Sequence, residues 1–356
     1  MKTTASRTTL KVLLWPTVLV LLVTPVFWLT DLDLSAAGYW YNNGWPAGKS
    51  PIWQFFYHAI PVLSLVLAVT PLLILALSCF WERAKNWRKP AVAVFLTMLI
   101  GPGILVNAIF KENWGRPRPA QVDIFQGQRE YLPPLKPAFG EKGKAFPCGH
   151  CSVSFSMAVF PLMTSHPYVA AVTAGGTLIF GALTGTARMA AGGHFLSDVI
   201  WSAWMSFLAA WLSLRIVNWQ GWKRYAFKPS AHRIKLATGA VVVGALVAGG
   251  ALLATPVDSE IRHQWQADAL PKTIFIEEGL VTVTSAQDGT LTLEGKVSGF
   301  GWPGSTVKLT QSGSNASLTE KGLFTEHRAQ YQVSIPPAQA SQIEIRVKNG
   351  RVTHHK

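Results

Sequence analysis

The sequence has little charge and few cysteines for its length. Only 14% of its 356 residues are Asp, Glu, Lys or Arg, whereas roughly 25% is usual in a soluble domain. Hydrophobic residues make up 49% of the chain, which excludes an intrinsically disordered protein. The three cysteines are too few for a disulfide-stabilised scaffold. Low charge together with long apolar runs predicts a protein embedded in a bilayer.

Acidic residues are the scarcer kind of charge, since 18 Asp and Glu stand against 32 Lys and Arg and the net charge is +14. Most of the basic excess lies in three segments between apolar runs, residues 1–11, 81–90 and 214–235. Excess Lys and Arg in such positions indicates cytoplasmic loops. We therefore interpret the charge as a signal of membrane topology and expect no nucleic-acid binding.

Seven apolar runs are long enough, or nearly so, to cross about 30 Å of hydrocarbon. They are residues 12–30, 57–80, 91–110, 151–165, 168–187, 195–214 and 236–254. With the N-terminus inside, every basic segment is cytoplasmic and four segments lie outside. These outer segments are residues 31–56, 111–150, 188–194 and everything after residue 255. Apolar length and charge therefore give the same multi-pass topology.

The N-terminal region allows two interpretations. Ala36 and Ala37 would suit cleavage after a signal peptide, but an apolar run of this length that contains Pro16 and Pro25 favours a retained span. The segment 39–57 is rich in aromatic residues and nearly uncharged. We expect it to lie along the outer membrane interface.

The composition changes after Pro256. Short stretches of alternating apolar and polar residues follow, and turn residues separate them, which predicts a small antiparallel β-sandwich. The stretches are residues 280–284, 290–296, 306–310, 330–335 and 342–347. This part resembles a bacterial immunoglobulin-like module in Gly295, Gly299, the stretch 302–309 and Tyr331.

We therefore predict an all-α polytopic membrane protein with a small C-terminal all-β sandwich domain. A six-span core would occupy residues 1–216, and a basic cytoplasmic linker with a seventh span would occupy residues 217–256. The sandwich would occupy residues 257–356 on the extracytoplasmic side. There it could bind an envelope partner.

The first of three polar motifs follows the third span and reads Lys111-Glu-Asn-Trp-Gly-Arg116-Pro-Arg118-Pro119. Its prolines end the helix. Three cations without a matching acidic run suit an anionic group, and arginine offers bidentate hydrogen bonds to phosphate. The alternative is a set of interfacial cations that snorkel to the membrane surface. Their outer position, against the positive-inside trend, favours anion binding.

The second motif, Phe146-Pro-Cys148-Gly149-His150-Cys151-Ser152, opens the fourth span. Pro and Gly before a helix leave backbone N–H groups free to bind an anion, and a histidine can exchange a proton near neutral pH. Cys148 and Cys151 also look like the redox motif of disulfide isomerases. The thioredoxin scaffold of those enzymes is not predicted here, so we expect no oxidoreductase activity. A disulfide between the two thiols that alters activity is a separate hypothesis.

The third motif runs from Arg188 through His194 to Asp198, between the fifth and sixth spans. His194 and Asp198 are four residues apart and would share one face of a helix. A carboxylate near one imidazole nitrogen fixes the tautomer and leaves the other nitrogen free as a nucleophile. Asp198 also lies just inside an apolar run, where an ionisable residue is a functional candidate. The alternative is an Asp that only favours the helix dipole.

In order and spacing, the three motifs resemble the signature of the type 2 phosphatidic acid phosphatase superfamily, over roughly residues 10–216. That signature is Lys, six residues, Arg-Pro; then Pro-Ser-Gly-His; then Ser-Arg, five residues, His, three residues, Asp. The matching residues are Lys111, Arg118, Pro119, Pro147, Gly149, His150, Arg188, His194 and Asp198. Two positions depart from it, because Cys148 and Ala187 stand where the signature has serine. A thiol is a weaker hydrogen-bond donor than a hydroxyl, so one phosphate contact should be weaker.

The resemblance implies hydrolysis of a lipid phosphate ester without a metal ion or any other cofactor. It implies that His194 attacks phosphorus and forms a phospho-histidine, and that Asp198 orients His194. His150 would protonate the leaving oxygen and later activate water. The phosphoryl oxygens would be held by Lys111, Arg118, Arg188, Cys148 and Gly149.

The site would lie at the outer face of a bacterial inner membrane, where a lipid can enter sideways. The family suggests lipid A, undecaprenyl pyrophosphate, phosphatidylglycerophosphate or phosphatidic acid as substrate, and the stretch 110–119 looks closest to lipid A phosphatases. A lipid-to-lipid phosphotransferase would use the same residues. A non-enzymatic envelope adaptor would need only the β domain. Vanadate-dependent haloperoxidases share the motif pattern, but seven spans argue against that soluble class.

Overall fold

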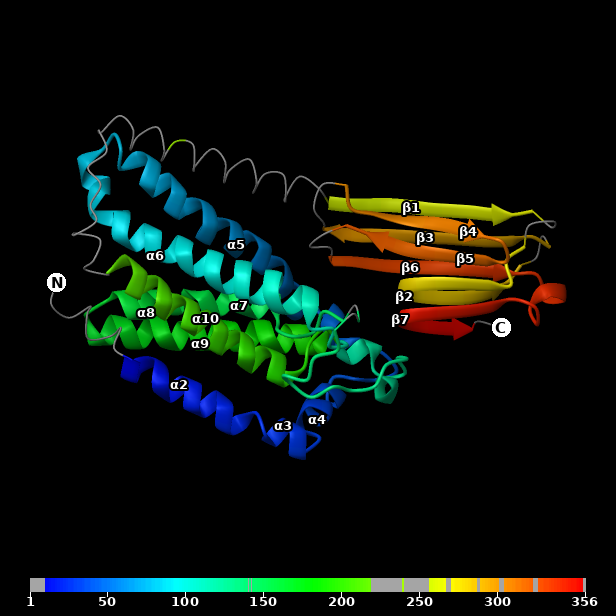
Figure 1. The fold of residues 1–356 in the computed structure, drawn as a ribbon, viewed down its shortest axis with the longest axis horizontal. Helices are drawn as coiled ribbons and strands as arrows, with labels where there is room; N and C mark the ends of the chain where they lie inside the picture. The colour runs from blue at the N-terminus through cyan, green and yellow to red at the C-terminus, as the bar shows by residue number, and fades with distance from the viewer. Residues whose placement is uncertain are drawn as a thin grey trace. The chain divides into compact units, whose positions relative to one another are not determined.

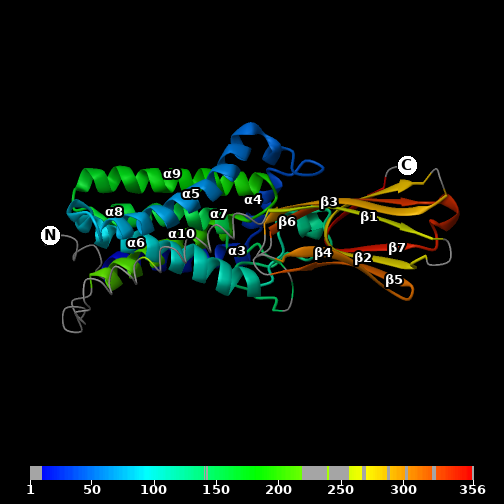
Figure 2. The same cartoon turned by 90° about the horizontal axis from the view of Figure 1, so that it is seen from above.

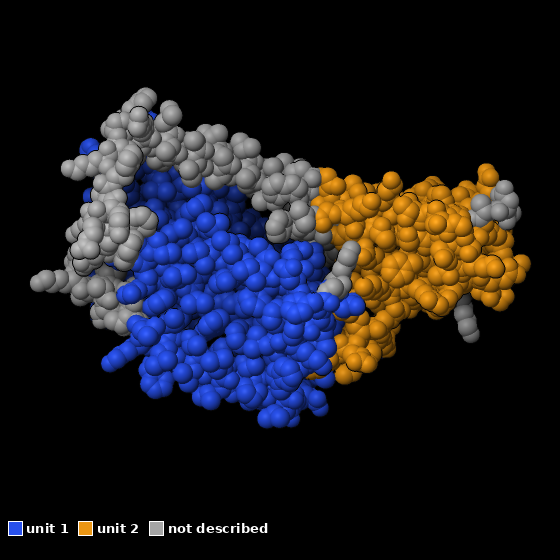
Figure 3. Space-filling model, viewed as in Figure 1, with its two compact units in different colours: residues 1–119, 132–247 blue, residues 120–131, 248–356 orange. Residues whose placement is uncertain are grey.

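The computed structural model describes residues 10–139, 141, 143–218, 239, 256–266, 270–286, 289–300, 304–322 and 326–354. The chain divides into two compact units (Figure 3). One unit consists of Met1–Pro119 with Leu132–Val247, and the other of Ala120–Tyr131 with Ala248–Lys356. The first unit is built from helices and the second carries all seven described strands.

Within the described residues, five helices are long and apolar enough to cross a membrane. The first, Leu10–Leu29, consists of α2 (Leu10–Val23) and α3 (Val26–Leu29). The second is α5 (Pro51–Leu77), and the third, Glu82–Lys111, joins η2 (Glu82–Trp87), α6 (Arg88–Met98) and a π-helical segment, η3 (Leu99–Lys111). The last two are α9 (Pro167–Ala190) and α10 (Leu196–Val217).

Shorter elements connect these helices. The segment after the first helix contains α4 (Leu32–Gly38) and η1 (Ala47–Lys49), and the loop after η3 contains η4 (Pro119–Gln121) and η5 (Asp123–Phe125). A shorter apolar helix, Gly149–Met163, runs through α7 (Gly149–Phe155), η6 (Ser156–Ala158) and α8 (Val159–Met163).

These helices confirm the predicted polytopic helical fold. The fourth predicted span, 151–165, corresponds to the short helix Gly149–Met163, which at 1.5 Å per residue is about 22 Å long. The second span begins at Pro51 instead of residue 57, because proline is well suited to the first helical position. The predicted seventh span, 236–254, and the basic linker before it lie outside the described residues, apart from residues 217, 218 and Gly239.

Helix α10 is the centre of the helical unit (Figure 1), since it packs against α2, α6, α7, α8 and α9. Half of its apolar window is buried, compared with 17% for the first helix. Small residues line its buried side, and they let neighbouring backbones approach closely. Ser202 donates to the Cys148 carbonyl at 3.0 Å, and Ser206 donates to the Ser152 carbonyl at 2.9 Å. These bonds fix α7 along α10.

The β unit has the strands β1 (Pro256–Trp265), β2 (Thr273–Ser285), β3 (Leu291–Phe300), β4 (Thr306–Ser312), β5 (Asn315–Lys321), β6 (Glu326–Ile335) and β7 (Glu344–His354). Figure 2 shows them in two layers. β3 pairs antiparallel with β1 and β6, and β4 with β5. β2 is parallel to β7 on one side, and on the other it pairs with β5 first and then with β6.

The all-β character of this unit is confirmed, but the purely antiparallel pairing was wrong, because β2 pairs in parallel with each of β5, β6 and β7. β2 changes partner near Gly279, whose φ is +145°. A Cβ at Gly279 would lie 2.6 Å from the Tyr331 ring, so only glycine fits there. Strands β1 and β5 were not predicted. β1 shows no clean alternation of apolar and polar residues, whereas β5 does alternate from Asn315 to Thr319 and was overlooked.

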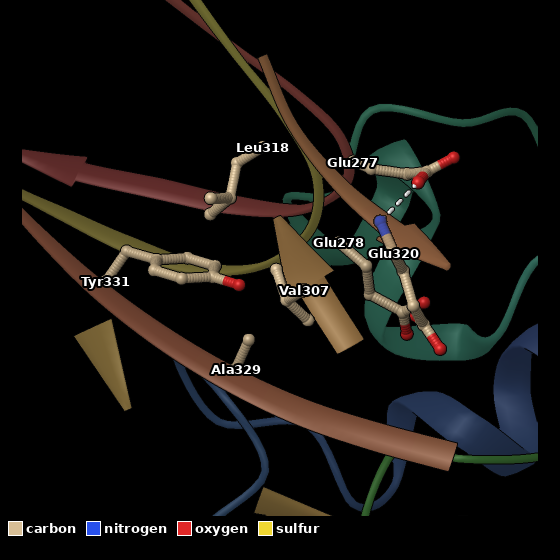
Figure 4. A pocket seen from close by; sticks show the side chains of 7 residues that line it. All are labelled: Glu277, Glu278, Val307, Leu318, Glu320, Ala329 and Tyr331. Atoms are coloured by element: carbon tan, nitrogen blue, oxygen red, sulfur yellow. Dashed lines mark hydrogen bonds between the residues drawn. The ribbon is translucent and has the colours of Figure 1, made fainter. Parts of the chain in front are cut away.

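Tyr331 also borders a small cavity of about 10 Å³ in the β unit, lined by Glu277, Glu278 and Glu320 on its polar side. Glu277 accepts the backbone N–H of Glu320 at 2.9 Å (Figure 4). Burial raises the pKa of Tyr331, and the nearby Glu320 and Glu278 carboxylates raise it further. A cavity of this size holds about one water molecule, so it is too small for an organic ligand.

Candidate active site

The loop between α9 and α10 carries the third motif and begins with a tight helix end. The Gly192 N–H donates to the Met189 carbonyl and the Gly193 N–H to the Arg188 carbonyl, both at 2.9 Å, the pattern of a Schellman cap. Gly192 has a φ of +64°. A Cβ on Gly193 would lie 2.8 Å from Arg188 Nη2. The two glycines therefore turn the chain and leave room for the Arg188 guanidinium beside His194.

His194 follows this turn and is fully buried. Its Nδ1 lies 2.6 Å from the Ala145 carbonyl oxygen and 3.7 Å from Asp198 Oδ2. A carbonyl oxygen can only accept, so Nδ1 carries a proton, and in the neutral ring Nε2 has a lone pair available for attack. Among the described residues, nothing forms a hydrogen bond with Nε2. The Ala145 carbonyl was not predicted, since no side-chain motif could reveal it.

Asp198 lies in the first turn of α10 and is fully buried. Its Oδ2 accepts the Phe195 N–H at 2.8 Å, and its Oδ1 accepts a hydrogen bond from Arg116 Nη1. A carboxylate that accepts from a helix N-terminus and from an arginine is held firmly in place. Arg116 belongs to the first motif but lies outside the family signature, which implied no role for it.

The second motif forms the start of α7. Cys148 is the N-cap residue, and its Sγ accepts the Cys151 N–H at 3.3 Å. Both cysteines are fully buried free thiols. A Cβ on Gly149 would lie 3.4 Å from Lys111 Nζ, so the buried ammonium at the end of η3 lies beside the first turn of α7. A helix N-terminus next to a lysine is a favourable place for a phosphate group.

The Cys148 thiol and the His194 ring influence each other's protonation. Burial raises the pKa of Cys148, but the Cys151 hydrogen bond and the charges of His194 and Arg188 outweigh it, and the pKa lies well below its ordinary value. Burial lowers the pKa of His194, but Cys148 and Asp198 outweigh it, and the pKa lies above its ordinary value of 6.5. Both shifts favour a thiolate beside an imidazolium.

His150 and Arg188 meet at a residue that the sequence had indicated only as part of an interfacial aromatic segment. Tyr57, from the second turn of α5, stacks on the His150 ring with 4.8 Å between centroids. The Arg188 guanidinium lies 4.9 Å from the centroid of the same Tyr57 ring, a cation–π contact. The only signal for Tyr57 in the sequence is its aromatic character, which it shares with its neighbours.

These contacts bring together seven of the eight predicted site residues, which are Lys111, Cys148, Gly149, His150, Arg188, His194 and Asp198. The eighth, Arg118, is half-buried in the loop that follows η3, two residues after Arg116. In the part of the chain that the structure describes, no three His, Cys, Asp or Glu side chains are grouped so that they could hold a metal ion.

Comparison with known proteins agrees with this arrangement. Residues 90–222, which contain all three motifs, match the PAP2 superfamily. The Lipid A 4'-phosphatase of Francisella tularensis subsp. novicida is 32% identical over 193 residues, which cover 51% of this chain and 84% of the relative. The Lipid A 4'-phosphatase of Rhizobium etli is 30% identical over 202 residues, 52% of this chain and 73% of the relative. No solved structure matches the chain.

The chain belongs to the PAP2 superfamily of phosphatases, as the three motifs predicted. It is a multi-pass membrane protein and a hydrolase that removes phosphate from a lipid. The family, the enzyme class and the polytopic fold with a C-terminal β domain are therefore confirmed.

Proposed function

We propose that this protein removes the 4'-phosphate of lipid A through a phospho-histidine on His194, without a metal ion. The observation that carries the mechanism is the geometry of His194. Its Nδ1 is fixed between the Ala145 carbonyl and Asp198, whereas no described residue forms a hydrogen bond with Nε2. A buried imidazole held in this way has one nitrogen oriented for attack.

In the first step, His194 Nε2 attacks phosphorus, and the bond between phosphorus and the lipid oxygen breaks. His150 gives its proton to the leaving oxygen. Phosphoryl transfer depends chiefly on positioning and on stabilisation of charge. Lys111, Arg118, Arg188 and the Gly149 N–H provide that stabilisation at the phosphoryl oxygens. Cys148, which the resemblance placed among these groups, has no proton to donate once its lowered pKa makes it a thiolate.

In the second step, water attacks the phospho-histidine. His150, now neutral, takes a proton from this water, and the bond between phosphorus and Nε2 breaks as inorganic phosphate forms. Asp198 stabilises the positive charge on the His194 ring in both steps. The cycle returns both histidines to their starting protonation states.

The membrane arrangement supports a site on the outer face of a bacterial inner membrane. Each motif is separated along the chain from the nearest basic segment by an odd number of predicted spans, so the motifs and the basic segments lie on opposite sides of the membrane. The basic segments are residues 1–11, 81–90 and 214–235. Because basic loops face the cytoplasm, the motifs face outward. In this proposal, residues 1–216 form the catalytic core and residues 217–256 a linker with a further span. The domain 257–356 is then extracytoplasmic, where it could bind an envelope partner.

The names of two relatives and the stretch 110–119 favour lipid A over the other family substrates. The test is phosphate release by detergent-purified protein from lipid A, undecaprenyl pyrophosphate, phosphatidylglycerophosphate and phosphatidic acid, each at the same surface concentration. We expect the highest kcat/KM for lipid A. A higher kcat/KM for another lipid would contradict the proposed substrate. Transfer of the phosphate to a second lipid without release would favour a phosphotransferase.

A further inference from the structure

A buried ion network contacts Oδ1 of Asp198, whereas Oδ2 lies 3.7 Å from His194 Nδ1. Arg116 and Asp33 have at most 1% of their side chains exposed, and Arg116 Nη2 lies 2.8 Å from Asp33 Oδ2. Arg116 Nη1 donates to Asp198 Oδ1 and, at 2.9 Å, to Ser197 Oγ. Arg116 Nε donates to the Leu132 carbonyl at 2.8 Å. One guanidinium therefore joins α4, two loop segments and the first turn of α10.

Asp33 holds the first turn of α10 directly as well. Its Oδ1 accepts the Ser197 N–H at 2.9 Å, and its Oδ2 accepts the Ser197 hydroxyl at 2.5 Å. The Arg116 guanidinium also lies 4.7 Å from the centroid of the Phe195 ring, and the Phe195 N–H is the other donor to Asp198. Both oxygens of the Asp198 carboxylate therefore depend on groups that this network holds in place.

Stability alone is a weak reason for such a network. Replacing a buried ion pair with apolar residues is often neutral or stabilising, because the charges lose their hydration when they are buried. Groups that hold a catalytic or metal-binding residue from behind have a different effect, since their loss typically costs 10- to 100-fold in activity or metal affinity. Arg116 contacts the Asp198 carboxylate directly, and Asp33 is connected to it through Arg116 and Ser197.

We propose that Asp33 and Arg116 are positioning residues, which keep the Asp198 carboxylate next to His194 during hydrolysis of the lipid phosphate. The proposal rests on the proposed function, because it needs His194 as the nucleophile and Asp198 as its partner. Neither Asp33 nor Arg116 is assigned a contact with the substrate.

The test compares Asp33→Asn and Arg116→Lys with the wild-type protein, purified in detergent. Asn has the same shape as Asp but no charge, and Lys keeps the charge of Arg116 but cannot bridge two carboxylates. We expect both variants to lower kcat about 10- to 100-fold and to leave KM within about twofold, because phosphate binding is unchanged. The matched control is Lys85→Met, which removes a cation from an exposed ion pair with Glu82 and should leave kcat unchanged.

The pH profile separates positioning from structural damage. The charged groups around His194 are Cys148 at the start of α7, Arg188 at the end of α9 and Asp198 in α10, and the Asp198 contact raises the pKa of His194. If Asp198 moves away, the pKa of His194 falls and the acid limb of kcat moves to lower pH. Partial loss of folded enzyme would reduce the whole profile and leave the limb in place.

His194→Ala is measured beside these variants, so that the two proposals can fail separately. If His194→Ala is inactive while folded Asp33→Asn keeps wild-type kcat and an unmoved acid limb, the positioning role is wrong and the proposed function stands. If His194→Ala still releases phosphate at the wild-type rate, the proposed function is wrong. Should Asp33→Asn not be recovered as a folded monodisperse protein, Arg116→Lys decides on the same criteria.

Discussion

The ring of Tyr57 lies on the imidazole of His150, with 4.8 Å between the ring centroids and 19° between the ring planes. The same ring lies 4.9 Å from the guanidinium carbon of Arg188. A single side chain from α5 therefore contacts the proposed general acid in α7 and a proposed phosphate ligand in α9. This relationship links the second span to the chemistry, although the family signature does not include it.

We predict that Tyr57→Ala lowers kcat/KM for phosphate release about 30-fold, because it removes a stacking and a cation–π contact, each worth about 1 kcal/mol, and about 1.4 kcal/mol is a factor of ten. Tyr57→Phe should stay near the wild-type value, since the ring is kept. Tyr168→Ala is the control, because Tyr168 is an exposed aromatic residue of α9. Equal activity of Tyr57→Ala and Tyr168→Ala would contradict the role of the stack.

Gly193 allows a test of the position of Arg188. A Cβ at residue 193 would lie 2.8 Å from Arg188 Nη2, so Gly193→Ala should move the guanidinium and raise KM about tenfold, the effect of about 1.4 kcal/mol of lost phosphate binding. The matched control is Gly175→Ala in α9, because nothing lies within 4 Å of a Cβ at that position. Activity measured over a range of lipid concentrations would show the difference, and an unchanged KM for Gly193→Ala would refute it.

Cys148 should set the acid limb of the pH profile. The proposed nucleophile His194 must be neutral to attack, so we expect activity to fall as the pH drops through its pKa, which is raised above 6.5. Serine carries no charge, so Cys148→Ser removes the largest contribution that raises this pKa. The acid limb should then move to lower pH, and activity below the original limb should rise about tenfold for each pH unit that the limb moves. Cys79→Ser is the control. An acid limb at the same pH in wild type and Cys148→Ser would disprove the effect of Cys148 on the pKa of His194.

The hypothesis of a Cys148–Cys151 disulfide gives a direct count of thiols. Both residues are free thiols in the structure. The Cys151 backbone N–H already donates to the Cys148 Sγ at 3.3 Å. After treatment with diamide, which takes up the two electrons and two protons, denatured protein should contain one free thiol instead of three, and phosphate release should change. Three thiols after treatment would rule out the disulfide, and dithiothreitol should restore both readings if it forms.

Much of the candidate site could be predicted because its residues are close in sequence or follow a fixed spacing. The spacing of four residues brought His194 and Asp198 together, with 3.7 Å between Nδ1 and Oδ2. The expected shared helix face was wrong, because α10 begins at Leu196 and His194 lies in the loop before it. Asp33 could not be predicted, because it meets Arg116 and Ser197 only through tertiary packing across more than 80 residues of sequence. The Ala145 carbonyl that accepts from His194 is a backbone atom and leaves no trace in the choice of side chain.

For the fold as well, local sequence patterns predicted individual elements but not how distant elements pair. The apolar runs gave the helical spans because each span must cover a fixed thickness of hydrocarbon. The β unit was predicted from local alternation, which reports strands but not their partners. The parallel pairing of β2 with β7 joins Thr273 to Glu344, and no turn between the two strands could indicate it.

In the proposed mechanism, everything depends on a covalent bond from His194 to phosphorus that forms without a metal ion. The most direct measurement is phosphate release from lipid A by wild type and His194→Ala, both with excess chelator, together with recovery of acid-labile phosphate bound to the protein. With chelator present, we predict that the wild type releases phosphate and carries protein-bound, acid-labile phosphate. A folded His194→Ala variant should show neither. Loss of wild-type release on chelation, or wild-type release by His194→Ala, would contradict the account.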